Sequence, residues 1–124
     1  VYLVPGCVDP TNPKVVRSTM GALLHVPVIT GPWGELSQTL EHCRLYVADF
    51  DLENGIPYAD VEWRQPSGLI IGGEANGPSG WAKGVADQVT YIPMHTRVES
   101  LNAGVAGSVI LFEADRQRRL SGDA

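Results

Sequence analysis

The stretch that most constrains the fold is residues 68–72 (GLIIG), a short apolar run with glycine at both ends. An apolar residue at every position suits a strand that is buried on both faces, as in a parallel sheet. Apolar patterning and turn residues predict further strands over residues 1–4, 26–29, 44–48 and 88–93. The sequence therefore predicts five short strands that are spread along the chain.

Helical patterns separate these strands. Asn12 or Thr11 can cap a helix that starts at Pro13 and runs to about residue 24, with Val15, Val16, Thr19, Met20, Leu23 and Leu24 on one apolar face. Further helices are predicted over residues 33–43 and 80–85, and from an N-cap at Ser100 to about residue 119. The first part of this last helix is apolar or small all round, which predicts burial. Residues 49–64 are predicted to form a polar connection.

Strands that alternate with helices predict an α/β fold, with a mostly parallel sheet covered by helices on both faces. A length of 124 residues suits one domain. No apolar run reaches the roughly 18–20 residues of a membrane span, so no membrane partner is expected. Cys7 and Cys43 share no metal-binding spacing with the scattered histidines, so no metal site is expected and both thiols are predicted to be free.

Charge argues against phosphate binding by this chain alone. It has 9 basic and 14 acidic residues, for a net charge of −5. An acidic surface attracts polyanions poorly. The basic cluster formed by Arg116, Arg118 and Arg119 favours an interaction with the end of the last helix over an RNA-binding patch.

Two loops at predicted strand ends are candidates for function, because ligands of open α/β sheets bind at the carboxyl ends of the strands. Residues 72–77 (GGEANG) form a glycine-rich loop that matches neither a phosphate-binding loop nor a dinucleotide fingerprint. It is either a simple turn or a backbone surface for a ligand. Glu74 is either a general base or metal ligand, or a carboxylate that is solvated or bonded to the backbone. Residues 92–94 and 100–102 predict either a pocket lined by backbone groups or tight helix–sheet packing.

These loops resemble a known family. Residues 72–77, 92–94, 99–106, 111–113 and 116–118 resemble motifs two and three of the SpoU (TrmH-like) RNA ribose 2′-O-methyltransferases of the SPOUT superfamily. Residues 6–17 resemble the segment of that family between motifs one and two. The likeness covers nearly the whole chain, with the motifs in the family's order.

The resemblance implies a C-terminal trefoil knot that holds S-adenosylmethionine, and transfer of its methyl group to a ribose 2′-hydroxyl of structured RNA, either rRNA or tRNA. It implies a homodimer, located in the cytoplasm or, in a eukaryote, in an organelle. By position, the cofactor contacts would be Gly72, Ile92 and Leu101, supported by Gly73, Gly77, Met94 and Ala103. Glu74, Ser100 and Asn102 match polar positions near the family's active site. Asn102 and Ser100 would shape the pocket and the dimer-spanning active site, and Glu74 would have either a structural or a substrate-orienting role.

One departure leaves two functions open. The Asn and Arg of the family's motif one have no match in residues 1–124, which predicts a single S-adenosylmethionine-binding domain that is N-terminally incomplete. The chain is therefore expected to belong to an RNA methyltransferase, or alternatively to a non-catalytic knotted remnant that acts as a dimerisation or scaffold module in a ribonucleoprotein assembly. A nucleotide hydrolase that uses Glu74 is disfavoured, because the sequence has no phosphate loop and no metal cluster.

Overall fold

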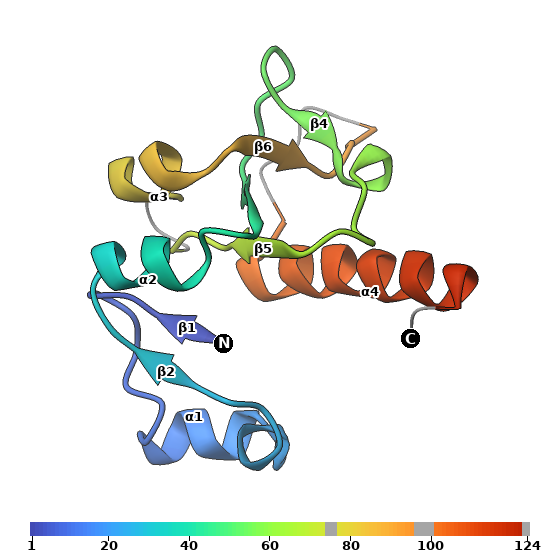
Figure 1. Ribbon diagram of the computed structural model, residues 1–124. Helices are drawn as coiled ribbons and strands as arrows, with labels where there is room; N and C mark the ends of the chain where they lie inside the picture. The colour runs from blue at the N-terminus through green and yellow to red at the C-terminus, as the bar shows by residue number, and fades with distance from the viewer. Residues whose placement is uncertain (74–76, 96–100, 123–124) are drawn as a thin grey trace. The chain divides into compact units, whose positions relative to one another are not determined.

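A computed structural model describes residues 1–73, 77–95 and 101–122 (Figure 1). The chain divides into two compact units, residues 1–39 and residues 40–124, and each is described by itself. Glu74 and Ser100, two predicted site residues, lie outside the described residues.

The first unit holds a two-stranded parallel sheet and short helices. Strands β1 (Tyr2–Leu3) and β2 (Ile29–Thr30) pair in parallel. The helices are α1 (Pro13–Ser18), the 3₁₀ turn η1 (Ala22–Leu24) and α2 (Trp33–Thr39). The predicted start of α1 is confirmed: Pro13 is its first residue, and the Asn12 side chain accepts a hydrogen bond from the Lys14 amide at 2.9 Å.

The predicted helix over residues 13–24 is wrong in its length. The helix ends at Ser18, because the chain turns left-handed at Met20 (φ 49°) and Gly21 (φ 88°) before η1 begins. The single apolar face therefore does not form, and Met20 and Leu24 are 92% and 86% exposed. The helix predicted over residues 33–43 is likewise shorter, since α2 ends at Thr39.

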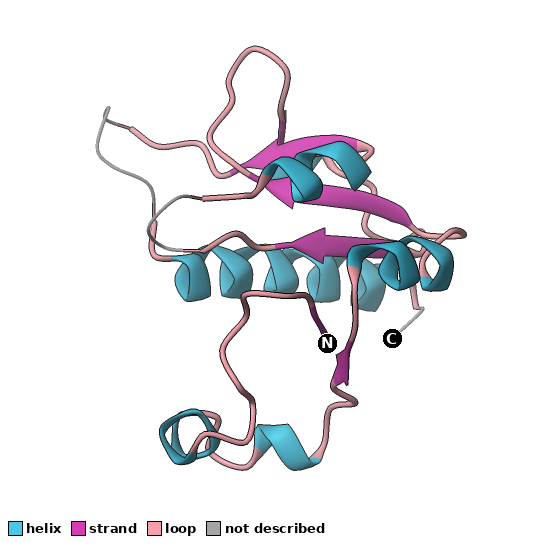
Figure 2. Cartoon of the chain, turned by 90° about the vertical axis from the view of Figure 1, so that its left-hand side faces the viewer, coloured by secondary structure: helices cyan, strands magenta, loops and turns pink. Residues whose placement is uncertain are grey.

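The second unit is built on a four-stranded sheet with the order β4-β6-β3-β5. Its strands are β3 (Arg44–Ala48), β4 (Ile56–Pro57), β5 (Ser67–Ile70) and β6 (Gln88–Tyr91). Between and after them lie η2 (Tyr58–Asp60), α3 (Gly80–Val85) and α4 (Ala103–Ser121). Figures 1 and 2 show α4 running alongside β5.

All described strand pairs are parallel, which confirms the predicted α/β class with a parallel sheet. The strands fall into two sheets rather than the single predicted one. In the larger sheet, Val47 pairs with Ile70 on one side and with Val89 on the other, so the carboxyl ends of β3, β5 and β6 lie at the same edge. Among the residues that the structure describes, no helix is long and apolar enough to cross a membrane.

The core of the second unit includes a segment that was predicted to be a polar connection. Tyr46, Val61, Trp63 and Ile110 form its buried cluster, and the rings of Tyr46 and Trp63 lie 4.9 Å apart between centroids. The Trp63 indole N–H donates to the Tyr58 carbonyl at 2.8 Å, so this large side chain is buried without an unsatisfied donor. The prediction of a polar connection holds for residues 49–55, which form an unburied loop, and is wrong at Val61 and Trp63. These two residues stand isolated among acidic neighbours and show no periodic pattern.

Polar contacts attach the C-terminal half of α4 to the chain around Trp63. The Gln117 side chain accepts from the Trp63 amide at 3.0 Å and donates to the Val61 carbonyl at 3.0 Å. Arg118 donates to the Trp63 carbonyl at 3.0 Å. Arg116 pairs with Glu113, and Arg119 pairs with Asp115. All three arginines of the basic cluster therefore have partners within this unit, which supports a structural role over an RNA-binding patch.

Helix α4 is only partly buried, which corrects the prediction of burial all round. Gly107 and Ile110 are its buried residues, whereas Val105, Leu111 and Phe112 are 49%, 61% and 72% exposed. One face of the helix packs on the core of its own unit. The other face exposes apolar side chains. The sequence does not distinguish the buried face from the exposed one, because apolar residues occur on both.

We expect Gln117→Leu to lower the free energy of unfolding by about 2 kcal/mol, because it removes two side-chain hydrogen bonds of about 1 kcal/mol each. The Trp63 amide and the Val61 carbonyl then keep only the bond of 3.1 Å between them. Urea unfolding followed by circular dichroism measures this change. Arg119→Ala is the control, since it removes only an exposed ion pair of the same helix and should cost less than about 1 kcal/mol. Equal losses of unfolding free energy in the two variants would contradict a stabilising role of the Gln117 contacts with Trp63 and Val61.

The Glu113 carboxylate makes stability depend on pH. Hydrogen bonds from Arg116 and Gln117 lower the pKa of Glu113 from 4.5 to about 2. Since the folded-state pKa is the lower one, the stabilisation is present above about pH 4.5 and is lost as the pH falls toward 2. The difference in unfolding free energy between the wild type and Glu113→Gln should shrink over that interval. A difference that stays constant across it would refute the assignment.

Candidate functional site

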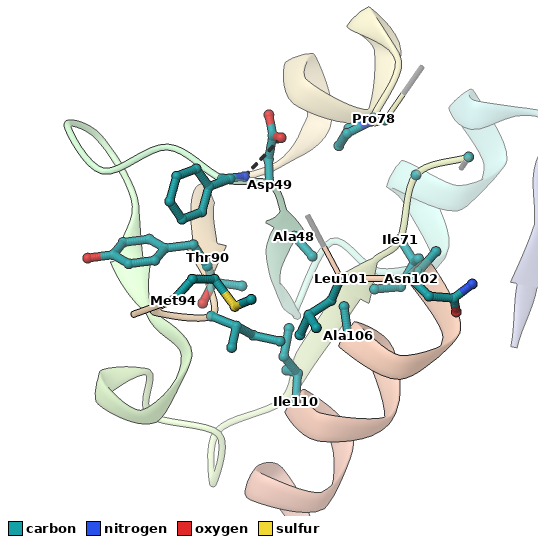
Figure 3. Close-up of a pocket in the computed structure, with 17 residues that line it drawn as sticks. Ala48, Asp49, Ile71, Pro78, Thr90, Met94, Leu101, Asn102, Ala106 and Ile110 are labelled. Carbon is teal, nitrogen blue, oxygen red and sulfur yellow. Dashed lines mark hydrogen bonds between the residues drawn. The ribbon is translucent and has the colours of Figure 1, made fainter. Parts of the chain in front are cut away.

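A cavity of about 540 Å³ lies at the carboxyl ends of β3, β5 and β6 (Figure 3). We call it the strand-end cavity. Four segments contribute its walls, and its lining residues are Ala48, Asp49, Phe50, Ile71, Gly72, Gly73, Gly77, Pro78, Thr90, Tyr91, Ile92, Met94, Leu101, Asn102, Ala103, Ala106 and Ile110. Most of these are apolar or small. The cavity lies wholly within the second unit.

The glycine-rich loop forms one wall through close backbone packing. A Cβ at Gly72 would lie 2.3 Å from the Pro78 nitrogen and 2.4 Å from the Gly77 carbonyl carbon. The loop is closed by a hydrogen bond of 2.9 Å from the Gly77 amide to the Gly73 carbonyl, and Gly77 has φ 63°. Only glycine fits at position 72, and glycine is favoured at 77. At Gly72, Gly73 and Gly77 the cavity is therefore lined by backbone.

The ends of β3 and β6 are tied together at the floor of the cavity. The Asp49 amide donates to the Thr90 carbonyl at 3.1 Å, and the fully buried Thr90 hydroxyl donates to the Ile56 carbonyl at 2.9 Å. These bonds satisfy the polar groups that the cavity would otherwise leave buried and unpaired. The ends of β3, β6 and β4 are thus joined by hydrogen bonds at the edge of the sheet that lines the cavity.

The start of α4 forms the opposite wall, and Asn102 begins it. The Asn102 side-chain oxygen accepts from the amides of Gly104 at 2.9 Å and Val105 at 3.2 Å. Asn102 is therefore the N-cap, which corrects the predicted N-cap at Ser100. Figure 3 shows Ala106 and Ile110 on the helix beside Leu101, on the side that faces the cavity. The small side chains at 103 and 106 leave the space open.

The structure brings the predicted binding residues together. Gly72, Gly73, Gly77, Ile92, Met94, Leu101 and Ala103 all line the strand-end cavity, and so does Asn102. They come from three segments that are separated along the chain. Glu74 and Ser100 lie outside the described residues. The placement agrees with the predicted site, while the role of each residue stays a prediction.

Sequence reasoning missed the wall formed by Ala48, Asp49 and Phe50. The Asp49 carboxylate lies 3.1 Å from the Lys83 ammonium on α3, and the Phe50 ring packs edge-on against Tyr91 at 6.2 Å. The available signal was the predicted strand over residues 44–48, since the residue after a parallel strand lies at the ligand-binding edge. Within the described ranges, no group of three or more His, Cys, Asp or Glu side chains is arranged to hold a metal ion.

This arrangement defines a class of protein. A cavity of several hundred Å³, lined by apolar and small residues together with polar groups and placed at the carboxyl ends of parallel strands, is typical of a site for an organic cofactor or another small molecule. The second unit is therefore an α/β unit with a candidate small-molecule site.

Comparison with known proteins identifies the family. The sequence profile of the SpoU rRNA Methylase family matches residues 1–112. The chain belongs to this family.

Two curated relatives and one solved structure illustrate the likeness. A 23S rRNA (uridine(2479)-2'-O)-methyltransferase of Streptomyces viridochromogenes is 34% identical over 116 residues, covering 89% of this chain and 40% of the relative. The 23S rRNA (guanosine(2553)-2'-O)-methyltransferase RlmP of Bacillus subtilis is 30% identical over 112 residues, covering 90% of this chain and 45% of the relative. The chain thus spans less than half the length of these relatives.

Among solved structures, the SpoU methyltransferase AviRb of Streptomyces viridochromogenes, in complex with the cofactor AdoMet, superposes with a TM-score of 0.80 at 32% identity. The match covers 94% of this chain and 49% of AviRb. The fold is therefore shared along nearly the whole chain.

Gly72→Ala should destabilise the second unit by about 2 kcal/mol or more, because the new methyl group would overlap the backbone at Gly77 and Pro78. Gly107→Ala is the matched control, since its Cβ would lie at an ordinary 3.6 Å from the Ile71 side chain and alanine favours a helix. Thermal unfolding of the two variants tests the contrast. Loss of stability only in the Gly107 variant would contradict the close packing of Gly72 against Gly77 and Pro78.

Proposed function

We propose that the full-length protein is an RNA methyltransferase that transfers a methyl group from S-adenosylmethionine to a ribose 2′-hydroxyl of rRNA or tRNA. The observation that carries this proposal is the convergence on one cavity of the described candidate residues, which are Gly72, Gly73, Gly77, Ile92, Met94, Leu101, Asn102 and Ala103. Family membership and the names of the two curated relatives support the reaction and the RNA substrate.

The strand-end cavity suits S-adenosylmethionine in size and chemistry. Its volume of about 540 Å³ lies within the usual range for small-molecule sites, and apolar walls at Ile71, Ile92 and Leu101 suit a purine base. Backbone groups of Gly72, Ile92 and Leu101 would hold the cofactor, with Gly73, Gly77, Met94 and Ala103 completing the contacts. When bound, the cofactor supplies a methyl group on a positively charged sulfur. The AdoMet complex of AviRb supports this choice of cofactor.

The residues of this chain contribute binding and orientation. Methyl transfer requires that the donor carbon and the ribose hydroxyl be held in line, so rigid positioning lowers the barrier. Asn102 contributes by fixing the start of α4 beside Leu101. We assign Ser100 a role in shaping the same wall and Glu74 a role in orienting the substrate, on the strength of the family motif.

Two further features belong to this proposal. In a C-terminal trefoil knot, the chain would pass through one of its own loops beside the cavity. The small residues Ala103, Ala106 and Gly107 at the start of α4 leave room for another segment to pass close by, which supports the knot. A homodimer would cover the exposed apolar face of α4, where Val105, Leu111 and Phe112 lie. We assign residues 1–124 to a single S-adenosylmethionine-binding domain, located in the cytoplasm or in an organelle.

We expect Ala106→Leu to abolish S-adenosylmethionine binding while leaving the protein folded, because the larger side chain would fill part of the cavity. Isothermal titration calorimetry of the full-length protein measures binding. Arg119→Leu is the control: it adds an apolar side chain to the exposed surface of the same helix, away from the cavity.

The outcomes separate the possible functions. Binding by the wild type together with methylation of RNA supports the proposal. Binding without transfer would favour the non-catalytic remnant, and a folded wild type that binds no cofactor would refute both the cavity assignment and the enzyme.

A further inference from the structure

Asp49 occupies an unusual position in the strand-end cavity. It is the only acidic or basic side chain among the described residues that line the cavity, and it directly follows β3. Its side chain is 31% exposed, so it lies neither fully buried nor free in solvent. Figure 3 shows the carboxylate above Ala48, with its hydrogen bond to the Phe50 amide drawn.

The Asp49 carboxylate is held in place and retains acceptor capacity. One oxygen accepts from the Phe50 amide at 3.0 Å, and the other lies 3.1 Å from the Lys83 ammonium. The backbone is fixed by the bond of 3.1 Å from the Asp49 amide to the Thr90 carbonyl. A carboxylate has about four lone-pair sites, and these contacts use about two. The group is therefore preorganised to accept further hydrogen bonds from a ligand.

We propose that the Asp49 carboxylate accepts hydrogen bonds from the ribose hydroxyls of the adenosine moiety of the cofactor. This inference rests on the proposed function and adds a residue outside the family motifs described above. Two vicinal hydroxyls match the two oxygens of one carboxylate, and a carboxylate at a strand end is a known solution for ribose recognition in other α/β folds.

The Lys83 ammonium decides in favour of hydroxyl groups over a cationic ligand group. It already balances the charge of Asp49, so the ammonium of a bound amino acid would have to displace Lys83 or approach it against like-charge repulsion. Neutral hydroxyl groups can donate hydrogen bonds to the Asp49 carboxylate while Lys83 stays paired with it. The Asp49–Lys83 pair therefore favours a sugar over the amino-acid end of the cofactor.

The test compares Asp49→Asn with the wild type of the full-length protein. Calorimetry is carried out with S-adenosylmethionine, S-adenosylhomocysteine and 5′-methylthioadenosine, because the last of these keeps the ribose but lacks the amino acid. All three should lose affinity by a similar factor of about ten or more, the usual size for a hydrogen bond to a charged group. A loss confined to the two amino-acid ligands, or no loss, would overturn the inference.

Glu53→Gln is the matched control, because Glu53 is an exposed carboxylate in the same loop and does not line the cavity. A second measurement needs no variant: the wild type should bind 2′-deoxy-5′-methylthioadenosine less tightly than 5′-methylthioadenosine, and equal binding would contradict the inference. If the wild type binds none of these ligands, the proposed function fails. If it binds them and Asp49→Asn binds them equally well, only the role of Asp49 fails.

Discussion

The packing of Ile110 against the sheet is the contact on which the second unit depends. Its side chain is 1% exposed, belongs to the cluster with Tyr46, Val61 and Trp63, and also lines the strand-end cavity. One residue therefore joins the core to the site. Because α4 is anchored there, the turn that carries Ala103 and Ala106 is held at a fixed distance from the strand ends.

The polar contacts of the second unit reinforce this arrangement from both ends of α4. At its start, Asn102 satisfies the amides of Gly104 and Val105. Toward its end, Gln117 and Arg118 bond to the backbone around Trp63. Hydrogen bonds of this kind contribute little net free energy each, yet they fix geometry because unpaired buried groups are costly. The cavity thus depends on the position of α4 as well as on the loop residues that line it.

The structure shows which partners the charged side chains of the second unit have. The net charge of −5 coexists with arginines that are engaged within the second unit: Arg116 with Glu113, Arg118 with the Trp63 carbonyl and Arg119 with Asp115. Among the described residues that line the cavity, Asp49 is the only acidic side chain, and Lys83 pairs with it. Within the described residues, the charged side chains named here therefore pair within the second unit, and the arginines of α4 do not form an unpaired basic surface for RNA.

The sequence by itself determined the α/β class, the strand over residues 44–48, the helix over residues 80–85 and the loops that form the cavity, because apolar runs and glycine-rich turns are local signals. Only the tertiary structure decided that Val61 and Trp63 enter the core, that the first helix stops at Ser18, and that Asp49 joins the cavity wall. These outcomes depend on contacts between residues far apart in the chain, or on left-handed turns at positions such as Met20 that no local pattern marks. A single strand end becomes a binding site only when its neighbours in the sheet are in place.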